Sequence, residues 1–135
     1  MKGRRLARAT ALQVLYLIDV SGIPEEIALS TQQEALNSLK ESDSSFSRNL
    51  VSGTRKFLNE IDQKIAAAAA HWRLDRMTSV DRNILRLSTY ELSYVPETPS
   101  KVAINEAIEI AREFSTEESA RFVNGILDKI SKSEK

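Results

Sequence analysis

Apolar residues recur at intervals of three and four positions along almost the whole chain, and this spacing constrains the fold more than any other feature. Such spacing gathers apolar side chains on one face of an α-helix, whereas a half-buried strand would need strict alternation. The 135 residues include only four glycines and three prolines, which disfavours a β-sandwich or barrel with many tight turns. We therefore predict an all-α fold in one compact domain of about six to seven helices.

Helix ends are marked by residues that suit caps and breaks. Gly22 is expected to end the first helix, and Pro24 suits the first turn of the next. N-terminal caps are expected at Asp43–Ser44, Thr78–Asp81 and Ser115–Glu118. The predicted helices cover about residues 4–20, 24–40 (with a possible break at residues 30–31), 45–70, 78–94, 102–114 and 115–131. Residues 1–131 are then the domain, and residues 132–135 a frayed tail.

Composition excludes several classes of site. The chain has no cysteine and a single histidine, His71, so thiolate chemistry and histidine-rich metal sites are excluded. It contains no glycine-rich phosphate loop, no His-Glu metal motif and no nucleophile elbow, so we expect neither an enzyme nor a cofactor. Nineteen basic residues balance nineteen acidic ones, so nucleic-acid binding would depend on local patches. No apolar run approaches a membrane span, and a cytoplasmic protein is the expectation.

The N-terminal helix carries the first candidate for RNA binding. Arg5 and Tyr16 fall on one flank of this helix, and Arg4 and Arg8 lie close by. Guanidinium groups bind phosphates and stack on bases, and an aromatic ring offers a stacking surface. The alternative is an exposed basic helix end with a partly buried tyrosine.

Aromatic and basic residues elsewhere give weaker signals. Phe122 stands at the margin of its helix's apolar stripe, which suits either a core residue or a base-stacking one. We expect Trp72 to be a core residue that closes the end of the third helix. A further arginine cluster is interleaved with aspartates, so local ion pairs explain it as well as RNA does. That cluster consists of Arg73, Arg76, Arg82 and Arg86.

Several segments together resemble one known family. The chain opens with Arg4-Arg5-Leu-Ala-Arg8 and continues with Ala11-Leu12-Gln13-Val-Leu15-Tyr16. Four later segments agree in order and spacing: FSRNLVSG (46–53), VDRNILRLSTYEL (80–92), KVAINEAIEIA (101–111) and FVNGILD (122–128). With these segments the chain resembles the NusB family of transcription antitermination factors over nearly its whole length.

The resemblance implies a fold of two packed three-helix groups and a function without catalysis. It implies a heterodimer with NusE, a small-subunit ribosomal protein, that recognises the single-stranded boxA element of nascent ribosomal RNA. Other Nus factors and RNA polymerase are then indirect partners. The alternatives are a protein adaptor whose arginines pair with an acidic partner, and a stand-alone RNA-binding module in ribosomal RNA processing or modification.

The resemblance also implies roles for individual residues. The residues expected to bind RNA are Arg4, Arg5, Arg8, Tyr16 and Phe122. The residues expected to contact NusE are Asp81, Arg82 and Leu85 at the start of the fourth helix.

Overall fold

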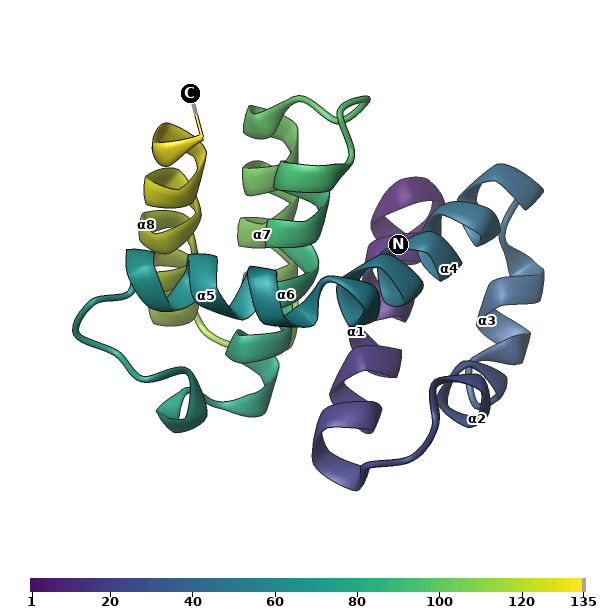
Figure 1. Ribbon diagram of the computed structural model, residues 1–135. Helices are drawn as coiled ribbons and strands as arrows, with labels where there is room; N and C mark the ends of the chain where they lie inside the picture. The colour runs from purple at the N-terminus through teal and green to yellow at the C-terminus, as the bar shows by residue number, and fades with distance from the viewer. Residues whose placement is uncertain (135) are drawn as a thin grey trace. The chain divides into compact units, whose positions relative to one another are not determined.

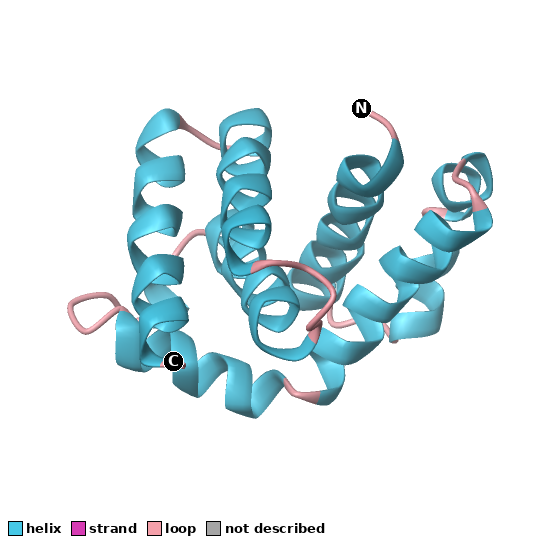
Figure 2. Ribbon diagram, turned by 90° about the horizontal axis from the view of Figure 1, so that it is seen from above, coloured by secondary structure: helices cyan, strands magenta, loops and turns pink. Residues whose placement is uncertain are grey.

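The computed structural model describes residues 1–134, and within that range it contains helices and no strand (Figure 2). Figure 1 labels its α-helices α1 to α8, and one short 3-10 helix, η1, precedes α6. Their bounds are α1 Gly3–Ser21, α2 Glu25–Ser30, α3 Gln33–Ser38, α4 Glu41–Lys56, α5 Leu58–Ala68, η1 Leu74–Arg76, α6 Ser79–Tyr94, α7 Ser100–Phe114 and α8 Glu117–Ser133. The all-α prediction is confirmed. None of these helices has the length and apolar character needed to cross a membrane.

The chain divides into two compact units, and the first comprises residues 1–56. In this unit α1 packs mainly on α4, and the short helices α2 and α3 lie against α1 and α4. Ala7 and Ala11 of α1 are fully buried, and their small side chains allow close approach of the neighbouring helix. A buried hydrogen bond joins the pair, because the Ser47 hydroxyl of α4 donates to the Ala7 carbonyl at 2.8 Å.

The second unit begins at Phe57 and contains α5, η1, α6, α7 and α8. Only the short turn at Ser115–Thr116 separates α7 from α8, which makes these two helices antiparallel neighbours. Helix α6 packs on both of them, and α5 packs on α6 and α8. Leu85, Val123 and Leu127 contribute fully buried side chains to the core of this unit.

The predicted third helix is two helices in the structure. At Phe57 the backbone leaves helical geometry (φ −104°, ψ 24°), and α4 ends while α5 begins. The Phe57 ring stacks on Tyr94 of α6 with centroids 4.5 Å apart, a contact within the second unit. The prediction of one continuous helix was wrong because the apolar spacing runs through the break without interruption. The possible break in the second helical region is real, since α2 ends at Ser30.

Some predicted caps hold and others shift. Gly22 ends α1 in the left-handed region (φ 68°), and its N–H donates to the Ile18 carbonyl at 2.8 Å. Thr78 caps α6 by accepting from the Asp81 N–H. Thr116, not Ser115, caps α8, because its hydroxyl accepts from the Ser119 N–H at 2.9 Å. Asp43 does not cap α4, which begins at residue 41. Helix α8 runs two residues beyond the predicted end, and Lys135 lies outside the described residues.

Candidate nucleic-acid interface

Two arginines of α1 share one aromatic ring of α4. The guanidinium carbon of Arg4 lies 4.1 Å from the Phe46 ring centroid, and that of Arg8 lies 5.2 Å from it. Arg4 also donates to the Ser42 carbonyl at 3.2 Å, and its Nε lies 3.5 Å from the Asp43 carboxylate. Cation–π contacts and an acidic residue in the first turn of α4 hold the basic end of α1 against that helix.

The four candidate residues of α1 differ in how far a ligand could reach them. Arg8 is 6% exposed, so its guanidinium belongs to the packing of α1 on α4. The Arg4 side chain is half-exposed, and Arg5 and Tyr16 are exposed. The structure therefore brings Arg4 and Arg8 together on Phe46, and Arg4 and Arg5 are the exposed arginines of the motif. RNA contact by any of them stays a prediction.

In the second unit, Phe122 forms an aromatic pair with Trp72. Phe122 is half-buried on α8, and its ring meets the Trp72 ring edge-to-face, with centroids 5.5 Å apart and planes at 79°. The prediction of a buried Trp72 was wrong, because its side chain is 62% exposed. Trp72 lies between α5 and η1, and its ring contacts Phe122 of α8 instead of entering the core.

Asp81, the first candidate for partner contact, is engaged inside the second unit. It is buried on the first turn of α6, and the hydroxyls of Ser115 and Ser119 donate to its two carboxylate oxygens at 3.2 and 3.0 Å. The spacing of Thr78 and Asp81 predicts a reciprocal capping box. The Asp81 carboxylate instead binds the turn between α7 and α8 and the start of α8.

The other two candidates for partner contact are also engaged. Arg82 donates to the carbonyls of Leu74 and Met77 at 3.2 and 3.1 Å, and so fixes η1 against the start of α6. Leu85 is fully buried. A contact of this segment with NusE stays a prediction. Because the Leu85 side chain is buried, such a contact would have to be formed by exposed residues of α6.

Most of the second arginine cluster forms internal contacts. Arg86 binds Asp62 of α5 through two hydrogen bonds of 2.9 and 3.0 Å, and Arg73 pairs with Asp75 at 2.8 Å. With Arg82 on backbone carbonyls, three of the four arginines have structural partners. Ion pairs therefore account for two of the four arginines, and backbone carbonyls for a third. Arg76 is exposed and forms no ion pair with any residue from 1 to 134.

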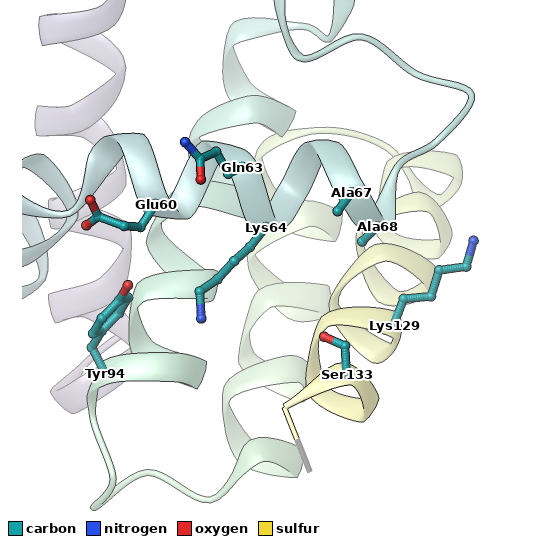
Figure 3. A pocket seen from close by; sticks show the side chains of 8 residues that line it. All are labelled: Glu60, Gln63, Lys64, Ala67, Ala68, Tyr94, Lys129 and Ser133. Atoms are coloured by element: carbon teal, nitrogen blue, oxygen red, sulfur yellow. The ribbon is translucent and has the colours of Figure 1, made fainter.

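A hollow of about 630 Å³ lies between α5, the end of α6 and α8 (Figure 3). Lys64 points across it towards Tyr94, and its ammonium lies 5.4 Å from that ring centroid. The same ammonium pairs with Glu134, which also accepts from the Ser93 hydroxyl at 2.7 Å. The lysine charge is thus compensated within the unit. Beside this hollow, burial raises the pKa of Tyr90 above its ordinary value of 10.0, and the charge of Glu97 adds to the effect.

No group of acidic residues and His71 in the described part of the chain could hold a metal ion. Two surfaces combine exposed basic or aromatic side chains: the exposed end of α1 in the first unit and the aromatic pair in the second. Both match what a protein needs to hold a nucleic-acid strand: exposed guanidinium groups for phosphates and aromatic faces for bases.

Comparison with known proteins decides the family. A family model described as the NusB family matches residues 5–132. The chain belongs to the NusB family. NusB relatives described as transcription antitermination proteins are similar over most of their length. One from Desulforamulus reducens is 43% identical over 95% of this chain and 89% of its own, and one from Solibacter usitatus is 46% identical over 96% and 89%.

Solved NusB structures have the same fold. The NusB of T. maritima superposes with a TM-score of 0.87 at 38% identity, over 98% of this chain and 93% of its own. A structure of the antitermination factors NusB and NusE in complex with dsRNA contains a chain with a TM-score of 0.88. That chain is 28% identical, and the match covers 96% of both chains.

Removing the Ser119 hydroxyl tests the buried carboxylate. Ser119→Ala should lower the free energy of unfolding by about 1–3 kcal/mol, because a buried carboxylate oxygen loses a charge-assisted donor. Urea unfolding measures the change. Ser93→Ala is the matched control, since its hydroxyl donates to an exposed carboxylate, and it should cost less than about 0.5 kcal/mol. Equal losses in the two variants would contradict the role given to Asp81.

Arg8 is buried and Arg5 is exposed, so substitutions at these two positions of α1 should change the stability by different amounts. Arg8→Gln should lower the free energy of unfolding by about 1–2 kcal/mol, because it removes a contact with Phe46 and buried methylene packing. Arg5→Gln should change it by less than about 0.5 kcal/mol, since the side chain is exposed. The same urea titration measures both, and an unchanged stability in Arg8→Gln would remove Arg8 from the packing of α1.

Proposed function

We propose that this chain is a transcription antitermination factor that binds RNA together with ribosomal protein NusE. The observation that carries the proposal is the match to the NusB family over residues 5–132, and a solved structure of NusB and NusE in complex with dsRNA supports it. Such a protein catalyses nothing. It works by holding an RNA segment and a protein partner in one geometry.

The RNA is a boxA-type single strand in the nascent transcript of ribosomal RNA operons. The complex with NusE then joins the other Nus factors on RNA polymerase and promotes transcription of these operons. A factor with this role acts in the cytoplasm, where bacterial transcripts are made. The relatives described as transcription antitermination proteins support this assignment.

The residues proposed to contact RNA lie on both units, and each set is tested separately. On α1 they are Arg5 and Tyr16, which are exposed, with Arg4 half-exposed and Arg8 supporting the others from its buried position. On α8 it is Phe122. The surface around Asp81, Arg82 and Leu85 at the start of α6 is proposed to contact NusE.

The proposal predicts that NusE and RNA bind cooperatively. If NusE tightens RNA binding, RNA must tighten NusE binding by the same factor, and couplings of this kind are about 1–3 kcal/mol. Calorimetry of the four binding steps, with a short boxA-type RNA and purified NusE, measures both factors. A scrambled RNA of the same length is the control.

Other outcomes of this experiment identify the alternatives. NusE binding with no change in RNA affinity would show a protein adaptor. RNA binding that is equally tight without NusE, and indifferent to the boxA sequence, would show a stand-alone RNA-binding module.

The salt dependence of RNA binding tests the arginines of α1. Each phosphate neutralised on a single strand contributes about −0.7 to the slope of log K against log salt. Arg5→Gln should therefore flatten the slope by about 0.7 for the NusE complex, and Arg8→Gln should change it less because its guanidinium is buried. Affinities measured over a salt series, with exposed Arg55→Gln of α4 as the control, give the slopes. The same slope in wild type and Arg5→Gln would make Arg5 part of a solvated helix end.

A further inference from the structure

Trp72 is the sole tryptophan of the chain, and it is exposed where a core position would be expected. Its backbone N–H donates to the Ala69 carbonyl at 2.9 Å, so a tight turn after α5 holds it in place. The edge-to-face contact with Phe122 orients the ring against α8 and still leaves most of its surface open. An oriented, exposed indole is a preformed surface for another flat ring.

Gly125 adds an independent observation on the same helix. It lies one turn after Phe122, in the interior of α8, where glycine destabilises a helix relative to alanine. A Cβ built on Gly125 would meet no heavy atom within 4 Å, so no packing neighbour in the chain requires a glycine there. The missing side chain leaves α8 bare beside the aromatic pair, where a ligand can approach the backbone closely.

The charge beside the pair favours a nucleic acid. Arg121 precedes Phe122 on α8, is exposed, and forms no ion pair with any residue the structure describes. Close to the two rings in sequence lie four exposed polar residues, His71, Arg73, Arg121 and Asn124, of which Arg73 is paired with Asp75. Guanidinium groups around a stacking ring suit a base and its phosphate.

We propose that Trp72, Phe122 and Gly125 form one nucleobase-binding surface, in which an unpaired RNA base stacks on Trp72 and the strand passes over Gly125. This inference rests on the proposed function, and it adds Trp72 and Gly125 to the residues that contact RNA. Because Trp72 stacks on any base through its ring face, the surface contributes affinity more than sequence preference.

Fluorescence tests the contact directly, because the emission of the free chain reports on Trp72 alone. Titration of the chain with a short boxA-type RNA should quench this emission along a saturable curve. In the NusE complex, Trp72→Leu should weaken RNA binding about 5- to 150-fold, the range expected for loss of one base–aromatic stack. Trp72→Phe keeps a ring and should lose less. Phe114→Leu, which removes an exposed aromatic ring from α7 of the same unit, is the control and should bind RNA like the wild type.

Gly125→Ala separates binding from stability, because the two should change in opposite directions. The alanine should raise the melting temperature by a few degrees through its helix propensity and weaken RNA binding several-fold by occupying the open space. Circular dichroism of every variant confirms that it is folded.

The outcomes that overturn the inference differ from those that overturn the proposed function. If the wild-type complex binds boxA-type RNA but Trp72→Leu binds it equally tightly and the fluorescence stays unchanged at saturation, the aromatic surface is not an RNA site. If Trp72→Leu loses NusE while the free chain still binds RNA as before, the surface belongs to the protein partner. If the wild-type complex binds no RNA at all, the proposed function itself fails.

Discussion

The buried carboxylate of Asp81 is the interaction on which the second unit depends. It lies on the first turn of α6, where the helix dipole favours a negative charge, and two serine hydroxyls complete its solvation. Both serines belong to the segment that turns from α7 into α8. A buried charge is costly without such partners, so the contact ties the first turn of α8 to the first turn of α6. Phe122 follows Ser119 by three residues on the same helix, and the position of the aromatic pair therefore depends on the contact between Ser119 and Asp81.

In the first unit, the Phe46 ring has the corresponding role for the basic end of α1. It holds two guanidinium groups, one half-exposed and one buried. A chain whose charges balance has no long-range field with which to attract RNA, so accessible local charge decides binding. The Arg8 guanidinium is buried against Phe46, whereas the side chains of Arg4 and Arg5 are exposed. Three arginines of one motif are thus not equivalent, although their spacing alone makes them look so.

Features that depend on residues close together in the sequence can be predicted from it. Helical spacing gives the all-α fold, Gly22 gives the end of α1, and Thr78 gives the start of α6. The break at Phe57 escapes prediction because the apolar spacing continues through it, whereas the Phe57 ring stacks on Tyr90 and Tyr94, which are distant in sequence. Asp81 has the spacing of a local cap, yet its carboxylate binds residues more than thirty positions away. The spacing of residues along the chain does not indicate contacts between segments that are distant in the sequence.

Trp72 shows why residue type alone misplaces a binding residue. Size and apolar character predict a core position, and only the path of the loop after α5 puts the ring at the surface. Departures from ordinary packing in this unit include two buried carboxylates, Asp81 and Glu91, an exposed indole and a glycine inside a helix. The Asp81 carboxylate accepts from two serine hydroxyls of the chain, which marks it as structural. The exposure of Trp72 and the open space at Gly125 have no compensation among the described residues, and such uncompensated departures are expected where a protein meets its ligand.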